Sequence, residues 1–413
     1  MNISFMMYKI LPAFLQFGAF FLVMGWSVVW SAEPDCRRDC PPRDDREFLQ
    51  SILDACRINS ICEFPTGVFT IDSPLQISKS IKIRGAGGGP RKKPHKRVTE
   101  IRVAEGVTSP AFVIQGDRSD INVHIRDLAI LAGGIHVGGQ KDPCRGIDDP
   151  FDLFQVNLTL SDLTIQATAL DSIFFEGESL TLQDVKVEGN IEGTGLYVAN
   201  ATGDVVIIDG QFVDNDRWGI YVCNNEGTGQ VFINDVAASQ NGRGGIAIVG
   251  KGSPPNLKTV CMQNTGTAFN FRFGILLFDV VKTLLFNVTA GFTFSEPDGH
   301  FGDGIAVSSS DDVLFWDVTA SLNNRSGFFV YGPSAAENTH VHLVGDVQSL
   351  NNGIIAAVEG DALFDPHNSQ TIVSGVCGGS FIAPPVNTYC EEGFVQVNCH
   401  AVPVTLGAPD HSP

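Results

Sequence analysis

The stretch NDRWGIYV, residues 215–222, decides the fold because its first five letters return along the chain. NGRGG begins at Asn241, NFRFG at Asn270 and NNRSG at Asn323, so the shared pattern is Asn-x-Arg-x-Gly. Each Gly is followed by a short apolar run such as GIYVC, GIAIV or GILLF. A repeat of 23 to 30 residues indicates a solenoid with one coil per copy. The glycines that mark the copies are Gly195, Gly219, Gly245, Gly274, Gly304, Gly327 and Gly353.

A second run of β-branched and aromatic residues follows several copies, for example DVVIIDGQF and DVLFWDVTA. Period-two alternation and turns rich in Gly, Asn and Asp predict an all-β chain, with helical periodicity confined to a segment around Asp45–Ala55. Strands of successive coils would pair about 4.8 Å apart, so equivalent residues would form ladders along the axis. We expect the Asn of the pattern to stack in such a ladder and to hydrogen-bond buried backbone, while the Gly permits the turn.

The segment CEFPTGVFTIDSPLQISKSIKIRGAG, Cys62–Gly87, resembles the first coil of right-handed parallel β-helix proteins of the pectin-lyase-like superfamily. The later Asn turns and GI-x-V runs are similar to the same fold, and the resemblance covers residues 56–382. It implies an all-β, single-stranded right-handed parallel β-helix with terminal caps. Proteins of this superfamily are mostly lyases, hydrolases and epimerases of polysaccharides, especially uronates, with some non-catalytic adhesins and phage spikes. A shared fold does not by itself transfer an activity.

The N-terminal segment predicts export. Residues 5–31 contain one charge, Lys9, and end in small residues, which is typical of a signal peptide cut near Ser31 or Ala32. An uncleaved membrane anchor is the alternative, since the run is long enough to span a bilayer. No second apolar run of that length follows, so we expect a secreted or extracytoplasmic protein without further membrane insertion. The expected divisions are 1–32 signal peptide, 33–55 N-terminal cap, 56–382 β-helix and 383–413 C-terminal cap or tail.

Cysteine content and charge narrow the class of partner. All ten cysteines follow the signal segment, which in an exported chain predicts disulfides, although their pairing cannot be read from sequence. A net charge of −19 argues against nucleic acid. We interpret the basic stretch RKKPHKR, residues 91–97, as a solvated loop, with a polyanion-binding patch as the alternative. Sequons, which would make a glycoprotein in a host that glycosylates, stand at Asn157, Asn200, Asn287 and Asn324.

Aromatic residues recur on one predicted face. After each Gly, the first and third residues should point inward and the second and fourth outward. The resemblance implies that this strand lines the substrate cleft, where exposed aromatics suit stacking on sugars, although a loop or the tail could cover them instead. The outward positions are Tyr197, Tyr221, Cys223, Leu276, Phe278, Phe329 and Tyr331.

An arginine ladder is expected beside that face, formed by Arg217, Arg243, Arg272 and Arg325, with a gap at Gly302. Guanidinium groups grip carboxylates through two hydrogen bonds, so a row of them would match the uronates of an acidic polysaccharide. The alternative is structural, with each Arg bound to turn carbonyls or to nearby acids.

One copy of the pattern is broken and reads HFGDG from His300. We interpret His300 as replacing the ladder Asn, Gly302 as replacing the Arg, and Asp303 as lying directly before the strand. Together with Arg272, His300 and Asp303 are the candidate catalytic residues, because proton abstraction at a uronate needs a base, an acid and a neutralised carboxylate. The alternative is a loop insertion whose His fills the Asn position.

Weaker candidates remain outside this cluster. FDPHNS resembles the Asp-Pro-His motif of mannuronan C5-epimerases at Asp365 and His367, but Asn368 stands where those enzymes have an acid, so a turn is favoured. Asp311 and Asp312 are also interpreted as a turn. No metal site or certain cofactor is expected, although Ca2+ is conceivable at acids such as Asp303, Asp298 and Glu359.

The sequence therefore predicts an exported β-helix protein that modifies an acidic polysaccharide as a lyase or C5-epimerase. Two alternatives stay open: a non-catalytic binding protein that uses the same face, and a structural surface β-helix. The sequence does not decide the oligomeric state.

Overall fold

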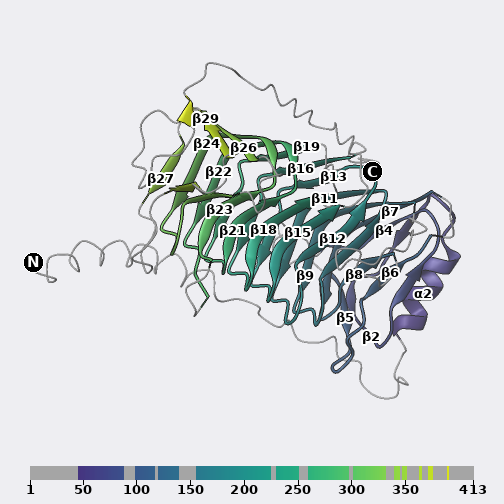
Figure 1. The fold of residues 1–413 in the computed structure, drawn as a ribbon. Coiled ribbons are helices and arrows are strands. Elements are labelled where there is room, and N and C mark those ends of the chain that lie inside the picture. Colours follow the sequence, from purple (N-terminus) through teal and green to yellow (C-terminus); the bar gives the residue numbers. More distant parts are fainter. Residues whose placement is uncertain are drawn as a thin grey trace, which may run out of the picture. The chain divides into compact units, whose positions relative to one another are not determined.

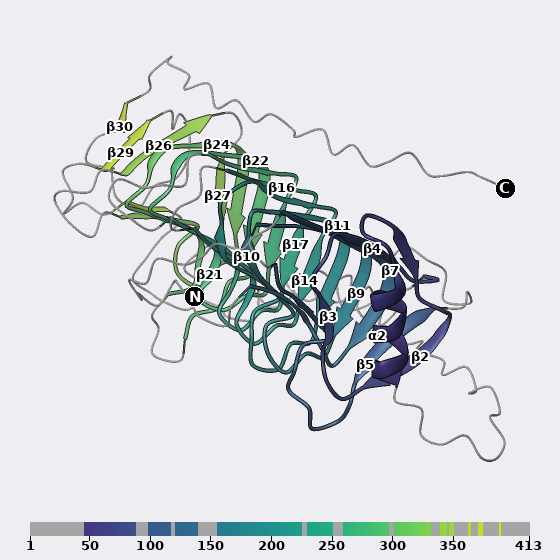
Figure 2. The same ribbon diagram turned by 90° about the vertical axis from the view of Figure 1, so that its right-hand side faces the viewer.

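The computed structural model describes residues 45–87, 98–116, 120–138, 155–224, 229–250, 259–296, 301–331, 339–344, 347–350, 362–364, 371–374 and 388–389. The chain divides into two units, residues 1–43 and 44–413, and every described residue belongs to the second. The described strands form two parallel sheets that wind around one axis (Figures 1 and 2). The protein is an all-β, right-handed parallel β-helix, as predicted.

The small sheet contains eleven strands, one from each successive coil (Figure 1). In chain order they are β3 (Leu75–Ile77), β6 (Phe112–Ile114), β8 (Ile135–Val137), β10 (Ile173–Gly177), β12 (Leu196–Ala201), β15 (Trp218–Asn224), β18 (Gly244–Gly250), β21 (Phe273–Phe278), β23 (Asp303–Ser308), β25 (Phe328–Tyr331) and β28 (Ala362–Phe364).

The large sheet contains nineteen strands, and two segments of each coil contribute to it. They are β1 (Ile61–Glu63), β2 (Gly67–Ile71), β4 (Ile81–Arg84), β5 (Thr99–Val103), β7 (Ile121–Leu131), β9 (Val156–Gln166), β11 (Ser179–Glu188), β13 (Val205–Ile208), β14 (Gln211–Val213), β16 (Gln230–Asn234), β17 (Ala237–Ser239), β19 (Thr259–Gln263), β20 (Gly266–Ala268), β22 (Val281–Gly291), β24 (Asp311–Ser321), β26 (Thr339–Val344), β27 (Gln348–Leu350), β29 (Thr371–Ser374) and β30 (Thr388–Tyr389).

In the eight successive coils from β7 to β24, a single residue in the left-handed region bends the chain between the two segments that belong to the large sheet. Asp and Asn tolerate positive φ better than other non-glycine residues, which explains why they occupy this position. This row was not predicted, because isolated Asp and Asn residues resemble ordinary turn signals in sequence. Its members, with φ between 47° and 60°, are Asp127, Asp162, Asp184, Asp209, Asp235, Asn264, Asn287 and Asp317.

Inward-facing aliphatic residues stack in rows and form a continuous core. On the small sheet, the first residue after each pattern Gly is buried, as in Ile220, Ile246, Ile275 and Ile305, each 0% exposed. Helix α2 (Asp45–Ala55) covers the N-terminal end of this core with Leu49 and Leu53 (Figure 2). The predicted helix near Asp45 is therefore confirmed.

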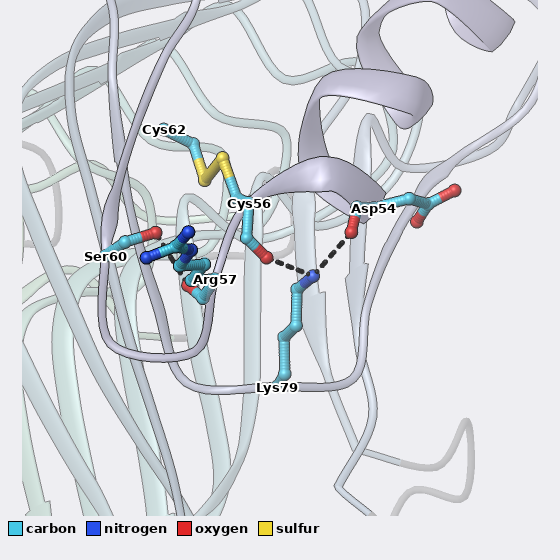
Figure 3. The surroundings of a disulfide bond; sticks show 6 residues. All are labelled: Asp54, Cys56, Arg57, Ser60, Cys62 and Lys79. Carbon is cyan, nitrogen blue, oxygen red and sulfur yellow. Dashed lines mark hydrogen bonds between the residues drawn. A yellow bond between two sulfur atoms is a disulfide. The ribbon is translucent and has the colours of Figure 1, made fainter.

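A disulfide closes the chain beyond α2, joining Cys56 to Cys62 on β1 (Figure 3). The Lys79 ammonium donates to the carbonyl oxygens of Asp54 and Cys56, at 3.0 and 2.7 Å, and so holds the C-terminal end of α2. A cation at this end also matches the helix dipole. No helix in the described residues is long and apolar enough to cross a membrane, and residues 5–31 lie outside them.

The asparagine ladder is confirmed. The side-chain amide of Asn215 donates to Oδ1 of Asn241 at 2.8 Å, and that of Asn241 donates to Oδ1 of Asn270 at 3.0 Å. The same oxygens accept the backbone N–H groups of Asn215 and Asn241. The three side chains are at most 2% exposed. The ladder thus satisfies polar groups that no water can reach.

Replacing Asn241 by Ala should lower the free energy of unfolding by about 3 kcal/mol, because it leaves the N–H and amide of Asn215 and the carbonyl of Phe212 without their partner. Urea denaturation measures this loss. Asn234→Ala is the matched control, since Asn234 lies in a solvent-accessible row, and it should cost under about 1 kcal/mol. Equal losses in the two variants would contradict the structural role of the buried ladder.

The half-buried His124 on β7 predicts acid sensitivity. Burial, together with the charges of Arg126 and Lys82, lowers the pKa of His124 from 6.5 to about 4, while its Nε2 lies 2.9 Å from the Ser161 hydroxyl. Because the folded state disfavours the imidazolium, stability is lost as pH falls from 6.5 towards 4. When the pH is lowered from 7.5 to 4, the free energy of unfolding of His124→Gln should fall by about 1–2 kcal/mol less than that of the parent, after allowance for the partial exposure of His124. Urea titrations at both pH values decide this, and parallel losses would refute it.

Candidate functional site

Strand register aligns one outward residue from each coil along the small sheet. The second residue after each pattern Gly occupies this row, so Tyr197 lies beside Tyr221, followed by Ala247 and Leu276. These tyrosines and Leu276 are half-buried, as are Phe278 and Phe329, so the alternation is confirmed for them. Cys223, predicted outward, is buried and disulfide-bonded, and the side chain of Tyr331 is outside the described residues. The full row is Gln76, Val113, His136, Phe174, Tyr197, Tyr221, Ala247, Leu276, Ala306, Phe329 and Leu363.

Ring contacts connect six of the outward side chains, which we call the aromatic row: His136, Phe174, Tyr197, Tyr221, Trp218 and Phe273. The ring centroids of consecutive members lie between 5.3 and 6.3 Å apart. The row therefore extends from β8 to β21 across six successive strands of the small sheet. Such a surface presents ring faces and edges parallel to the axis of the coil.

The contact between Trp218 and Phe273 depends on a glycine between them. The two residues stand two coils apart, with Gly244 in register between them. Their rings lie parallel within 5°, with centroids 6.3 Å apart. A Cβ on Gly244 would come within 2.1 Å of the Trp218 ring. Gly244 thus makes room for the indole, and the sequence analysis missed Trp218 because it precedes the Gly of the pattern.

A pocket of about 600 Å³ lies at the N-terminal end of the aromatic row. Its floor consists of outward residues of the first four small-sheet strands, Gln76, Val113, His136 and Phe174. Its walls come from the segments before β3, β6 and β10, including Pro74, Pro110 and Leu170. We call it the N-terminal pocket.

His136 is the titratable base of this pocket. Burial lowers the pKa of His136 below 6.5, so the ring is neutral at pH 7. Its Nε2 lies 3.4 Å from the carbonyl oxygen of Asp171, which can only accept, so this nitrogen bears the proton and Nδ1 is the acceptor. The sequence contained a signal for His136, since GIHV at Gly134 repeats the GI-x-V run, but the repeat was followed only from Gly195 onward.

The arginine ladder has the predicted register. The amide of Arg243 donates to the carbonyl of Arg217 at 2.7 Å, the amide of Gly302 donates to Arg272 at 2.8 Å, and the amide of Arg325 donates to Gly302 at 3.0 Å. The gap at Gly302 is therefore confirmed. Gly302 has φ of 100°, and a Cβ there would come within 2.4 Å of the Ser295 hydroxyl, which explains why neither Arg nor any other side chain stands there.

The side chains of the ladder differ in their partners. Arg272 forms an ion pair with Glu296, its Nε 2.6 Å from the carboxylate, and its guanidinium lies 5.3 Å from the Phe301 ring centroid. By contrast, Arg217 is half-buried and Arg243 exposed, and neither has a side-chain hydrogen bond or ion pair to another described residue. Two of the four cations are thus neutralised by acids, as in the structural alternative.

Asp303 is fully buried and pairs with Arg325. Nε of Arg325 donates to Oδ1 of Asp303 at 2.7 Å, Nη2 donates to Oδ2, and the amide of Ser326 donates to Oδ1 at 3.3 Å. The Arg325 guanidinium also lies 4.3 Å from the ring centroid of Phe329. Asp303 therefore orients Arg325, and Arg325 covers one side of Phe329. The proton-transfer role of Asp303 stays a prediction.

The interpretation of His300 as the ladder residue is corrected by the backbone register. The amide of Phe294 donates to Asn270, and the amide of Asn324 donates to Thr293, so Thr293 occupies the ladder position of this coil. Its own amide donates to Oδ1 of Asn323 at 3.1 Å, as in the other copies. The insertion begins after Thr293, which places His300 in added chain rather than in the Asn position. His300, Asp298, Glu359, Asp365 and His367 lie outside the described residues.

In the described part of the chain, no group of three or more His, Cys, Asp or Glu side chains is placed to hold a metal ion. Asp303 is engaged by Arg325. The predicted turn at Asp311 and Asp312 is wrong, because both residues belong to strand β24, where Asp312 has a positive φ of 52°.

Replacing Gly244 by Ala should separate Trp218 from Phe273, because the added methyl occupies the space of the indole. In protein labelled with 5-fluorotryptophan, the 19F resonance of Trp218, assigned with Trp218→Phe, should shift in Gly244→Ala. The resonance of Trp316, which is on the large sheet, should stay in place and serves as the internal control. An unchanged Trp218 resonance would show that the stack does not need Gly244.

No protein-family model matches the chain, and no curated protein matches it. Among solved structures, the chain is similar to the A-module of mannuronan C-5 epimerase AlgE4 of Azotobacter vinelandii, with 15% identity, a TM-score of 0.47, and coverage of 80% of this chain and 96% of that one. It is also similar to a catalytic domain of GH87 alpha-1,3-glucanase in complex with tetrasaccharides, with 12% identity, a TM-score of 0.47, and coverage of 85% and 71%. A third is the periplasmic alginate epimerase AlgG, with 14% identity, a TM-score of 0.42, and coverage of 83% and 81%. At these identities the likeness concerns the fold alone.

Proposed function

We propose that the protein is an exported, polysaccharide-modifying enzyme of the lyase or C5-epimerase type that binds an acidic polysaccharide along the outer face of the small sheet. The observation that supports this most directly is the aromatic row, in which six rings from five strands, spanning six successive strands of the small sheet, stand in contact along the axis. Sugar rings have apolar faces that stack on aromatic side chains. Because the row follows the coil axis, it fits an extended chain better than a single small molecule.

The charges beside the row favour an acidic chain. Arg217 and Arg243 stand in adjacent coils, about 4.8 Å apart, and no described acid pairs with them. A guanidinium that is not already paired can bind a substrate carboxylate without first breaking an internal ion pair. In a protein with a net charge of −19, such a cationic strip concentrates the attraction for an anion in one place.

The proposed reaction centre is the coil with Arg272, His300 and Asp303, next to this strip. A base removes the C5 proton of the uronate, and a cation stabilises the negative charge that develops on the carboxylate. In elimination, the electron pair forms a C4–C5 double bond, the C4–O bond breaks, and an acid protonates the leaving oxygen. In epimerisation, a proton returns to C5 from the opposite face. We assign proton transfer to His300 and the orientation of Arg325 to Asp303.

A second candidate, binding without chemistry, is favoured by the engaged state of two of these residues. Asp303 is 0% exposed, with hydrogen bonds to both carboxylate oxygens, and Arg272 is paired with Glu296. The same face, with Arg217 and Arg243, which pair with no described acid, would then serve only to hold the polymer.

Export is part of the proposal. The apolar segment 5–31 supports it, and so does the Cys56–Cys62 disulfide, since disulfides persist in oxidising compartments outside the cytosol.

The first experiment incubates the purified protein with pectate, alginate, glucuronan and neutral glycans, each with calcium and with chelator. Ultraviolet absorbance detects unsaturated uronate ends, a reducing-end assay detects chain cleavage, and proton exchange at C5 detects epimerisation. New absorbance or exchange on an acidic polymer supports the enzyme. Retention on an immobilised acidic polymer without any product supports the binding protein, and no retention on any polymer refutes both.

Variants then test the face itself. Tyr221→Ala and Arg243→Ala should each weaken binding of the acidic polymer about tenfold, and only the Arg243 contribution should shrink as salt is raised. Phe286→Ala and Arg126→Ala remove an aromatic residue and an arginine from the outer face of the large sheet and should leave binding of the acidic polymer unchanged. Affinity electrophoresis at two ionic strengths measures these effects, and a loss in the large-sheet variants instead would place the polymer elsewhere.

A further inference from the structure

The N-terminal pocket differs in charge from the rest of the face. Among the described residues, its lining contains one carboxylate, Asp72, and neither Lys nor Arg. Arg217 and Arg243 lie further along the axis, beginning at the coil of β15, which is two strands beyond β10. The single imidazole of the pocket, His136, is kept neutral by burial. A carboxylate placed in this pocket would therefore meet Asp72 and no compensating Lys or Arg among the described lining residues.

The polar groups of the pocket suit hydroxyls. Gln76 and Gln115 are exposed, and their side-chain amides have no hydrogen-bond partner among the described residues. Each amide offers both a donor and an acceptor, as a sugar hydroxyl does. Nδ1 of neutral His136 adds an acceptor, and the walls add the exposed hydroxyl of Thr108. Such a set binds an uncharged polyol without leaving a buried charge.

The apolar part of the pocket suits a ring. Phe174 lines it and is also the second member of the aromatic row, in contact with His136 at 5.5 Å and Tyr197 at 5.6 Å. A volume of about 600 Å³ accommodates a sugar ring or two within the range of ligand pockets. Because Phe174 belongs both to the pocket and to the row, a chain seated on the row continues into the pocket.

From this geometry we infer that the N-terminal pocket is a subsite for an uncharged sugar residue, and that the substrate is an acidic heteropolysaccharide containing both neutral and uronate units. The inference rests on the proposed binding of a polysaccharide along the small sheet. From β10 to β15 and β18 there are two and three strand spacings, so the neutral unit lies roughly 10–14 Å from the carboxylate that Arg217 or Arg243 binds.

The test compares three sets of oligosaccharides of equal length by isothermal titration calorimetry. One set mixes neutral and uronate units, as in fragments of rhamnogalacturonan, hyaluronan and glucuronoxylan. The second contains only uronates, as in oligogalacturonate and oligomannuronate, and the third consists of carboxyl-reduced forms of the first. At least one mixed oligosaccharide should bind about tenfold more tightly than both a pure uronate and its own reduced form.

Variants locate the neutral unit. Phe174→Ala and Gln115→Leu should each weaken the binding of the mixed oligosaccharide five- to tenfold, while leaving the affinity for pure uronates unchanged. Gln115→Leu keeps the volume of an exposed side chain, so it guards against a folding defect in Phe174→Ala. Phe286→Ala, on β22 of the large sheet, is the matched control and should affect neither set. Val113→Lys should strengthen the binding of pure uronates and weaken that of the mixed oligosaccharides, because it adds a cation to the pocket floor.

The outcomes separate this inference from the proposed function. If pure uronates bind most tightly and Phe174→Ala or Gln115→Leu weakens them, the pocket takes a charged sugar and the inference is wrong, although the proposed function stands. If pure uronates bind and no pocket variant affects any oligosaccharide, the pocket lies outside the site and the inference is likewise wrong. If no oligosaccharide of any set binds, the inference and the proposed binding of an acidic polysaccharide are both wrong.

Discussion

Parallel pairing between successive coils is the constraint on which the rest of the structure depends. Each strand of the small sheet hydrogen-bonds to the next in register, so a residue type that recurs at one position becomes a continuous row. At a spacing of about 4.8 Å, water does not fit between successive coils. A polar group buried there therefore needs a hydrogen-bond partner in its own or the neighbouring coil. Most inward and turn positions are accordingly apolar or hydrogen-bonded to a neighbouring coil, although a few buried atoms, such as Oδ1 of Asn215 and Oγ1 of Thr293, have no hydrogen-bond partner among the described residues. The outer positions are left to bind ligands.

The asparagine ladder shows how the turn meets this requirement. One amide can donate to the next Asn and accept from the previous coil, so Asn215, Asn241 and Asn270 satisfy one another as well as the backbone. In the coil that contains the insertion, Thr293 substitutes and relies on Asn323 instead. The backbone bonds of this coil stay in register on both sides, from the amide of Phe294 to Asn270 and from the amide of Asn324 to Thr293, so the inserted segment does not interrupt the pairing of the coils. This explains how a departure from the pattern at HFGDG coexists with intact strands on both sides.

Much of the fold could be predicted from sequence, because a repeated Asn-x-Arg-x-Gly pattern determines period, register and the direction of alternate side chains. The site could be predicted only in part. Contacts across coils, such as Trp218 with Phe273 over Gly244, join residues at the variable position before the pattern Gly, whose occupant the repeat does not determine. The pairing of Asp303 with Arg325 likewise depends on side-chain directions that the repeat does not encode. Counting back from Gly304 also misplaced His300, since an insertion shifts the count while the hydrogen bonds keep Thr293 in line.

Charge along the axis has a consequence for how a polymer can bind. Acids neutralise the ladder at Arg272 and Arg325, the arginines at 217 and 243 have no described acidic partner, and the described lining of the N-terminal pocket contains no Lys or Arg. The face is thus neutral at its N-terminal end and cationic in its middle. A chain that alternates neutral and uronate units therefore fits this face in registers that place a neutral unit in the pocket and a uronate beside Arg217 or Arg243. A shift by one unit would place a carboxylate beside Asp72, so the distribution of charge selects the register of binding before any residue of the proposed reaction centre acts.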